Sequence, residues 1–128
     1  MKLRWPILIA LLVGCNEDET LSGYVGKETL FSLKSINGAA FNGVATLDLS
    51  EAGKVFGDAP CNSYSASQTA PYPWFDVGPI IVTKRACEGL ALETMFLQAL
   101  GRMAFAEVSG PILILTNEAK EEMVFEAD

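Results

Sequence analysis

The chain has 128 residues, of which 50% are hydrophobic and 20% charged, and it carries 9 basic against 16 acidic side chains and no histidine. These proportions indicate one domain with enough apolar side chains for a core, and they argue against a disordered chain. The net charge of -7 argues against a nucleic-acid partner, because phosphate backbones are bound by lysine and arginine. Without histidine, the commonest general base and metal ligand are missing, and we expect no metal or other cofactor.

The first fourteen residues (1–14) have the layout of a secretory signal peptide. Lys2 and Arg4 precede an apolar run that ends at the small Gly14 and is too short to span a bilayer as a helix. The alternative is a buried N-terminal strand or helix, but the polar residues 16–20 interrupt the apolar pattern. We therefore predict a signal peptide here.

Residues 12–15, Leu-Val-Gly-Cys, resemble the bacterial lipobox, in which the cysteine is acylated and becomes the first mature residue. The resemblance implies that Cys15 is acylated, that the membrane is a partner through this lipid, and that the domain faces the periplasm from the cell envelope. Asn16 resembles the residues that sort lipoproteins to the outer membrane. The mature chain would carry 7 basic and 16 acidic side chains, a net charge of -9, and would stand off an anionic membrane on a flexible, polar tether over residues 15–27.

The two remaining cysteines, Cys61 and Cys87, are predicted to form a disulfide. Proteins with a signal peptide enter an oxidising compartment, where two such cysteines usually bond. A bridge across about 26 residues would stabilise the fold by about 3 kcal/mol. The alternative is two buried free thiols, since spacing alone does not establish the geometry. A redox-active pair would have Cys-x-x-Cys spacing, which these residues lack.

Alternation of apolar and polar residues predicts seven or eight short strands. Their connections are too short for crossovers, so the sheet is expected to be antiparallel. Pro71 and Pro73 should prevent regular pairing for several residues. Nine segments have strand character, two of which (74–77 and 80–82) are separated only by Gly78 and Pro79: residues 29–35, 44–49, 54–57, 61–67, 74–77, 80–82, 105–108, 112–116 and 122–125.

One segment, about residues 90–102, changes to a helical period. Its apolar residues recur on one face, no proline interrupts them, and the helix should close near Gly101. Residues 28–128 are therefore predicted to form an α+β domain, with a strongly curved antiparallel sheet and one packed helix. The apolar face consists of Leu92, Phe96, Ala99, Leu100 and Met103.

Three motifs, in this order, resemble the signature of the META domain, the HslJ-like heat-shock lipoprotein family. They are residues 57–64 (GDAPCNSY), 81–87 (IVTKRAC) and 93–100 (ETMFLQAL), and the resemblance extends over residues 28–126. One departure is Pro60, where the family commonly has a small residue. The family-signature residues on this chain are Gly57, Asn62, Tyr64 and Thr83.

The resemblance implies a cracked barrel with a helix against it, similar to the secretin pilotins that bind an acyl chain or a partner peptide. It also implies an exported, often lipidated protein tied to envelope stress or antibiotic tolerance, with no established catalytic residues. Asn62 and Tyr64 are better explained by structure than by binding, because asparagine caps turns and a buried tyrosine fills a core.

Three aromatic residues, Tyr72, Trp74 and Phe75, form the candidate partner surface. Prolines hold them in a loop, and aromatic side chains anchor many interfaces. The alternative is that they pack in the core or along its rim.

Our first functional hypothesis is a monomeric, non-catalytic, lipid-anchored binding module with a protein or acyl-chain ligand. The alternative is a hydrolase or hydrolase inhibitor that uses Asp76, Glu88 or Glu93 in a carboxylate-lined cleft. A third possibility is a structural spacer. An enzyme should show a pocket with a carboxylate of perturbed pKa, a binding module an apolar groove or patch, and a spacer neither.

Overall fold

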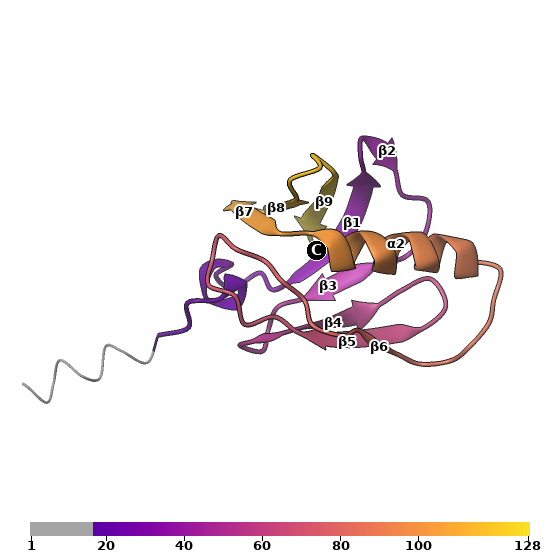
Figure 1. The fold of residues 1–128 in the computed structure, drawn as a ribbon, viewed down its shortest axis with the longest axis horizontal. Coiled ribbons are helices and arrows are strands. Elements are labelled where there is room, and N and C mark those ends of the chain that lie inside the picture. The colour runs from indigo at the N-terminus through magenta and orange to yellow at the C-terminus, as the bar shows by residue number, and fades with distance from the viewer. Residues whose placement is uncertain (1–16) are drawn as a thin grey trace, which may run out of the picture.

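Antiparallel strands joined by short turns make up most of the computed structural model, which describes residues 17–128 (Figure 1). The predicted signal peptide (1–14) and Cys15 lie outside the described residues. The strands are β1 Leu30–Ile36, β2 Ala39–Ala40, β3 Thr46–Asp48, β4 Lys54–Asp58, β5 Ser63–Ser67, β6 Ile81–Val82, β7 Phe105–Ser109, β8 Ile112–Thr116 and β9 Glu122–Ala127. The helices are a 3-10 turn, η2 (Leu21–Tyr24), and α2 (Leu90–Arg102).

The sheet follows the order β6-β5-β4-β3-β1-β9-β8-β7, with β2 paired only to β1. Every pairing between these strands is antiparallel. Within the described chain, β6 and β7 end the sheet without pairing to each other, so the sheet is curved but not closed into a barrel. This confirms the predicted α+β class in its curved-sheet form, and α2 has the predicted bounds.

The core lies between the inner face of the sheet and α2, which lies across β1 in Figure 1. Alternate residues of each strand point inward, and three residues of α2, Phe96, Ala99 and Leu100, close the core from the other side. Each large side chain buried in this way contributes about 1.5–3 kcal/mol. The fully buried strand residues include Phe31, Leu47, Val55, Leu113, Leu115, Met123 and Phe125.

The segment between β5 and β6, residues 68–79, is a loop where strand character was predicted over 74–77; we call it the proline loop. Its β-pairing is limited to three isolated bridges, Thr20 with Pro71, Gln68 with Val77 and Trp74 with Phe105. Prolines lack the backbone donor that a ladder needs, which explains the missing strand. The buried Gln68 side chain replaces part of the ladder, because its Oε1 accepts the backbone N–H groups of Ala70 (3.1 Å) and Asp76 (2.9 Å).

The predicted tether over 15–27 is wrong for its second half. Leu21, in η2, is 0% exposed, and Val25 is also buried. The backbone N–H of Tyr72 donates to the Glu19 carbonyl at 2.8 Å, which fixes the chain before η2 to the proline loop. In the sequence, Gly23 and Gly26 indicated a flexible linker. In the structure they permit a tight turn in which Leu21 is buried. The folded domain therefore begins near Glu19, well before the predicted residue 28.

Neither helix of residues 17–128 is long and apolar enough to cross a membrane.

At its C-terminal end, α2 is joined to the β8–β9 turn, because Arg102 donates from Nε and Nη2 to the Glu121 carboxylate, each at 2.9 Å. This bidentate pair holds the pKa of Glu121 below its usual value.

Leu21→Ala should lower the free energy of unfolding by about 2–5 kcal/mol, because it leaves a cavity beneath η2. The matched control is Leu30→Ala, since Leu30 is a partly exposed leucine on β1. Urea unfolding of the mature chain measures both. Equal, small effects of the two substitutions would contradict the assignment of residues 19–25 to the folded domain.

Candidate functional site

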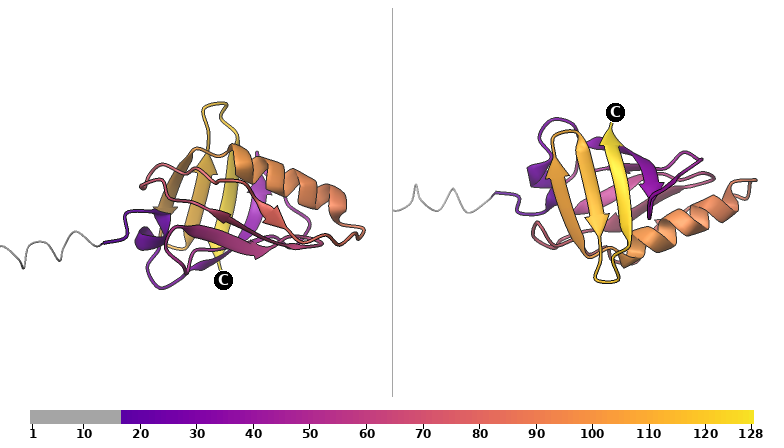
Figure 2. Two further views of the ribbon diagram at one scale, coloured as in Figure 1. Left: turned by 60° about the horizontal axis from the view of Figure 1, so that its bottom comes forward. Right: turned by 90° about the horizontal axis from the view of Figure 1, so that it is seen from above.

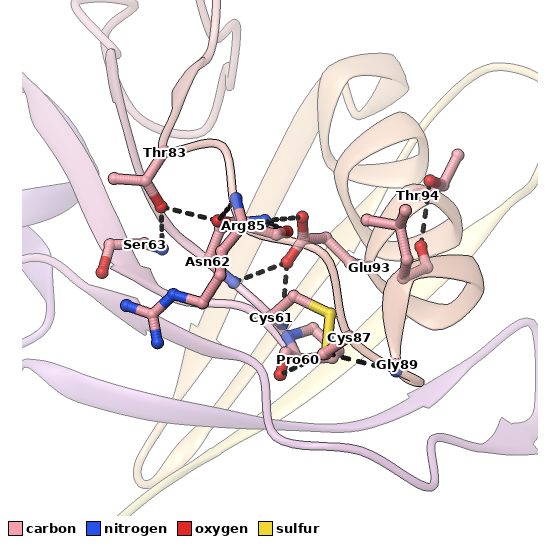
Figure 3. Close-up of a disulfide and its surroundings, with 11 residues drawn as sticks. Pro60, Cys61, Asn62, Ser63, Thr83, Arg85, Cys87, Gly89, Glu93 and Thr94 are labelled. Atoms are coloured by element: carbon pink, nitrogen blue, oxygen red, sulfur yellow. Dashed lines mark hydrogen bonds between the residues drawn. A yellow bond between two sulfur atoms is a disulfide. The ribbon is translucent and has the colours of Figure 1, made fainter.

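A disulfide joins Cys61, just before β5, to Cys87, just before α2, with a Cα–Cα distance of 5.7 Å (Figure 3). The predicted bond is therefore confirmed, and the alternative of two free thiols is excluded. Gly89 lies beside it, and a Cβ atom at that position would come within 2.9 Å of the Pro60 side chain. The corner before β5 and the start of α2 are thus packed too closely for a side chain between them.

Directly beside the disulfide, the Glu93 carboxylate is buried, with 3% of the residue exposed. Its Oε1 accepts the backbone N–H groups of Cys61 (2.9 Å) and Asn62 (2.8 Å), and its Oε2 accepts the Asn62 side-chain amide at 2.7 Å (Figure 3). A charged acceptor strengthens all three bonds. The helix is therefore tied to the start of β5 by hydrogen bonds as well as by the disulfide.

The Asn62 side chain extends the same network toward β6. Its Oδ1 accepts the Thr83 hydroxyl at 2.8 Å and the Arg85 backbone N–H at 2.7 Å, and its Nδ2 donates to the Arg85 carbonyl at 2.9 Å as well as to Glu93. Every polar atom of the buried amide is thereby paired, as burial requires. We call Asn62, Thr83, Arg85 and Glu93, with the backbone of Cys61, the Glu93 clasp.

The pKa of Glu93 reflects two opposed effects. Burial by itself raises it, but the hydrogen bonds from the Asn62 side chain and from the backbone of Cys61 and Asn62 outweigh burial and leave the pKa below its ordinary value. The carboxylate is thus held ionised by internal donors. A general acid would need the opposite shift, and a general base would need access to substrate.

Gly57 and Tyr64 form a second tight contact, around Thr46 of β3. The Tyr64 hydroxyl donates to the Thr46 carbonyl at 2.7 Å, while its ring meets Phe96 edge to face. A Cβ atom at Gly57 would collide with the same Thr46 carbonyl oxygen. Burial and the nearby Asp48 and Asp58 raise the pKa of Tyr64. All four family-signature residues thus have structural partners.

The outer face of the β3–β6 half of the sheet carries an open groove of about 670 Å³. Strand register places Leu30, Asp48, Phe56, Ser65 and Ile81 side by side across five strands. Ile81, on the end strand β6, is 72% exposed. The groove therefore presents apolar side chains to solvent in a row, with hydroxyl and carboxylate groups between them.

The charged residues of this groove are mostly acidic. Asp48, Glu51 and Asp58 line it, against one basic side chain, Lys54, which pairs with Glu51 at 3.9 Å. A second, smaller concavity of about 310 Å³, here called the helix-side cleft, lies between α2 and the β1–β2 turn. Its lining is mainly apolar and includes Ile36, Phe41, Leu92, Met95 and Ala99.

The META domain family matches residues 25–128. The chain belongs to the META domain family. Among solved structures, it is similar to a protein from Burkholderia xenovorans determined by NMR, at 19% identity and a TM-score of 0.65, over 84% of this chain and 86% of that one. A second NMR structure matches at 18% identity and a TM-score of 0.61, over 79% of this chain and 90% of that one. No curated protein matches the chain.

The predicted aromatic partner surface of this META domain is only partly exposed. Phe75 is 1% exposed and belongs to the core, so its assignment to a surface is wrong. Tyr72 is half-buried, stacked on Tyr24 at a centroid distance of 4.5 Å. Trp74 is exposed and rests against Phe105. The alternation of prolines and aromatics did not reveal which ring turns inward.

The three carboxylates considered for catalysis are not brought together by the META fold. Glu93 is enclosed in its clasp, whereas Asp76 and Glu88 are exposed and line neither the groove nor the helix-side cleft. Among residues 17–128, no three His, Cys, Asp or Glu side chains are grouped as a metal site requires.

The groove was not predicted from the sequence, because the side chains that lie side by side across neighbouring strands are known only once the strand register is known.

Glu93→Gln should destabilise the META domain by about 2–3 kcal/mol at pH 7, because it weakens charge-assisted bonds and faces the Asn62 amide with a second donor. Since the folded pKa of Glu93 is lowered, its contribution is complete above the ordinary value of 4.5 and is lost as the pH falls through the folded pKa. The difference in unfolding free energy between wild type and Glu93→Gln should therefore narrow below about pH 4.5.

Urea unfolding between pH 7 and pH 3 measures this difference. Glu88→Gln, at an exposed carboxylate in the same segment, is the control and should stay close to wild type throughout. A gap for Glu93→Gln that remains constant over this pH range would contradict the clasp as a stabilising ionised group.

Proposed function

We propose that this META domain protein is a non-catalytic, lipid-anchored binding module of the bacterial envelope, held by an acylated Cys15 and facing the periplasm. The observation that carries the proposal is the groove on the outer face of β3–β6, where the exposed Leu30 and Ile81 and the half-buried Phe56 alternate with Asp48 and Ser65. A surface of this kind recognises a partner by burying apolar area. A contribution to envelope stress or antibiotic tolerance is the role that family resemblance suggests.

The chemistry of the groove favours a polypeptide segment with apolar and basic side chains. Leu30, Phe56 and Ile81 would receive the apolar residues, while Asp48 and Asp58 would face the basic ones. β6 ends the sheet, so an extended segment lying beside it would also meet strand backbone. This combination gives the groove a preference in both shape and charge.

Two further features support an envelope location. The Cys61–Cys87 disulfide is typical of proteins that fold in an oxidising compartment. The lipobox-like sequence ends at Cys15, only a few residues before the fixed backbone at Glu19. Against a hydrolase, the Glu93 carboxylate is enclosed by hydrogen bonds from its own domain, and these bonds lower its pKa.

Intact-mass analysis of protein extracted from its native membrane tests the anchor. We expect a chain that begins at Cys15 and carries acyl groups, with Cys61 and Cys87 reacting with an alkylating agent only after reduction. A chain with unmodified Cys15 and an uncleaved N-terminus would contradict the anchored location, whatever the groove binds.

NMR titration of the mature chain carrying Cys15→Ser tests the groove. An extended peptide of alternating valine and lysine should shift the backbone amides of Phe56, Ser65 and Ile81, whereas a valine–glutamate peptide should not. Ile81→Ser should weaken binding about tenfold by removing a buried apolar contact. Val44→Ser, at an exposed residue outside the groove, should leave binding unchanged.

Equal binding of the two peptides would contradict the charge preference, and shifts that avoid the groove would contradict the site. A fatty acid used in the same titration tests the other ligand class. Shifts confined to Leu92, Met95 and their neighbours would place binding in the helix-side cleft instead.

A further inference from the structure

Four aromatic side chains gather at one end of the domain, and we call them the aromatic end: Tyr24, Tyr72, Trp74 and Phe105. Tyr24 stacks on Tyr72 with ring centroids 4.5 Å apart, and Trp74 packs on Phe105 at 5.4 Å. Tyr24 remains 51% and Trp74 54% exposed despite these contacts. Two amphipathic rings from separate segments, η2 and the proline loop, thus face solvent together.

The backbone beneath these rings is firmly held. The N–H of Phe75 donates to the Ala104 carbonyl at 2.9 Å, and the N–H of Ala106 donates to the Pro73 carbonyl at 2.8 Å. The Tyr72 hydroxyl accepts the Val108 N–H at 3.1 Å. The exposed rings are therefore presented by a fixed surface, and contact with a partner would need little ordering of the loop.

The aromatic end also holds the N-terminal end of the described residues. Thr20 bridges to Pro71, and Tyr72 donates to the Glu19 carbonyl, so the backbone is fixed from Glu19 onward. Four residue steps separate Glu19 from Cys15, which an extended chain spans in about 14 Å. η2 lies at one end of the molecule and the first turn of α2 at the other, in every view (Figure 1 and Figure 2).

We propose that the aromatic end is a membrane-contact surface that docks the domain on a zwitterionic lipid surface. The inference rests on the proposed acylation of Cys15, which would hold this end within about 14 Å of the bilayer. Tyrosine and tryptophan suit the membrane interface, because their rings enter the headgroup region while their polar atoms stay hydrated.

The charge of the side chains near the aromatic end determines which lipid headgroups it can approach. The exposed acidic residues Glu17, Glu19 and Glu107 lie on the same segments as the rings or directly beside them. An anionic surface would repel these carboxylates, whereas zwitterionic headgroups would not. Docking should therefore depend on the aromatic rings and weaken as anionic lipid is added.

The experiment uses two properties of the mature chain. Trp74 is its sole tryptophan, because the other, Trp5, lies in the signal peptide. Cys15 is its sole free thiol once Cys61 and Cys87 are bonded. The oxidised mature chain can therefore be coupled through Cys15 to a maleimide lipid in phosphatidylcholine vesicles, which reproduces the tether whether or not the native chain is acylated.

With brominated acyl chains in these vesicles, we expect the Trp74 emission to shift to the blue and to be quenched. Tyr24→Ser should reduce the quenching, since it removes the second exposed ring. Leu90→Ser, at an exposed apolar residue on the opposite end of the molecule, should leave it unchanged. Replacing phosphatidylcholine by phosphatidylglycerol should lower the quenching, and added salt should restore part of it.

Emission that stays unquenched in coupled, vesicle-bound protein would overturn the docking and leave the anchor untouched. Quenching that rises with phosphatidylglycerol would overturn the choice of a zwitterionic surface. Quenching that Tyr24→Ser and Leu90→Ser reduce equally would overturn the assignment to the aromatic end. An unacylated Cys15 would appear only in the intact-mass analysis, so failure of the anchor is distinguished from failure of the docking.

Discussion

The ionised Glu93 carboxylate, buried in the first turn of α2, is the group on which the arrangement of this domain depends. A buried charge is costly unless donors surround it, and here Asn62 and the backbone of Cys61 supply three. The requirement works in both directions. The carboxylate needs the corner before β5, and that corner needs an acceptor for its backbone N–H groups. Helix, sheet and the segment before α2 are therefore positioned by one charge.

This constraint gives a structural role to two of the META signature residues, Asn62 and Thr83, and the other two have a second contact of their own. Asn62 and Thr83 complete the shell around Glu93, while Gly57 of β4 and Tyr64 of β5 both contact the Thr46 carbonyl of β3. A polar cluster that satisfies itself leaves no group free for a ligand. We therefore propose recognition at surfaces outside the clasp, namely the groove and the aromatic end, where apolar side chains are exposed to solvent.

The sequence predicted the α+β class, the bounds of α2 and the Cys61–Cys87 bond, because periodicity and cysteine number report local preference and compartment. Prediction from the sequence failed for features that depend on tertiary contacts. Leu21 is a lone leucine among polar residues, and only η2 packing against the domain buries it. Phe75 turned out to be core because the proline loop rotates one ring inward and leaves Trp74 outside. The groove needed the strand register, which one sequence does not contain.

The aromatic end and the groove occupy different parts of the molecule. Their separation bears on how the protein would work at a membrane. Figure 1 shows η2 and the start of the described chain at one end and the first turn of α2, which follows the disulfide-bonded Cys87 by three residues, toward the other. The groove lies on the outer face of β3–β6, away from the face that α2 covers. A domain docked by its aromatic end would therefore leave the groove open to a partner beside the membrane. Docking would also remove much of the rotational freedom of a tethered domain, so that a partner in the same membrane would meet the groove in a restricted orientation at high effective concentration.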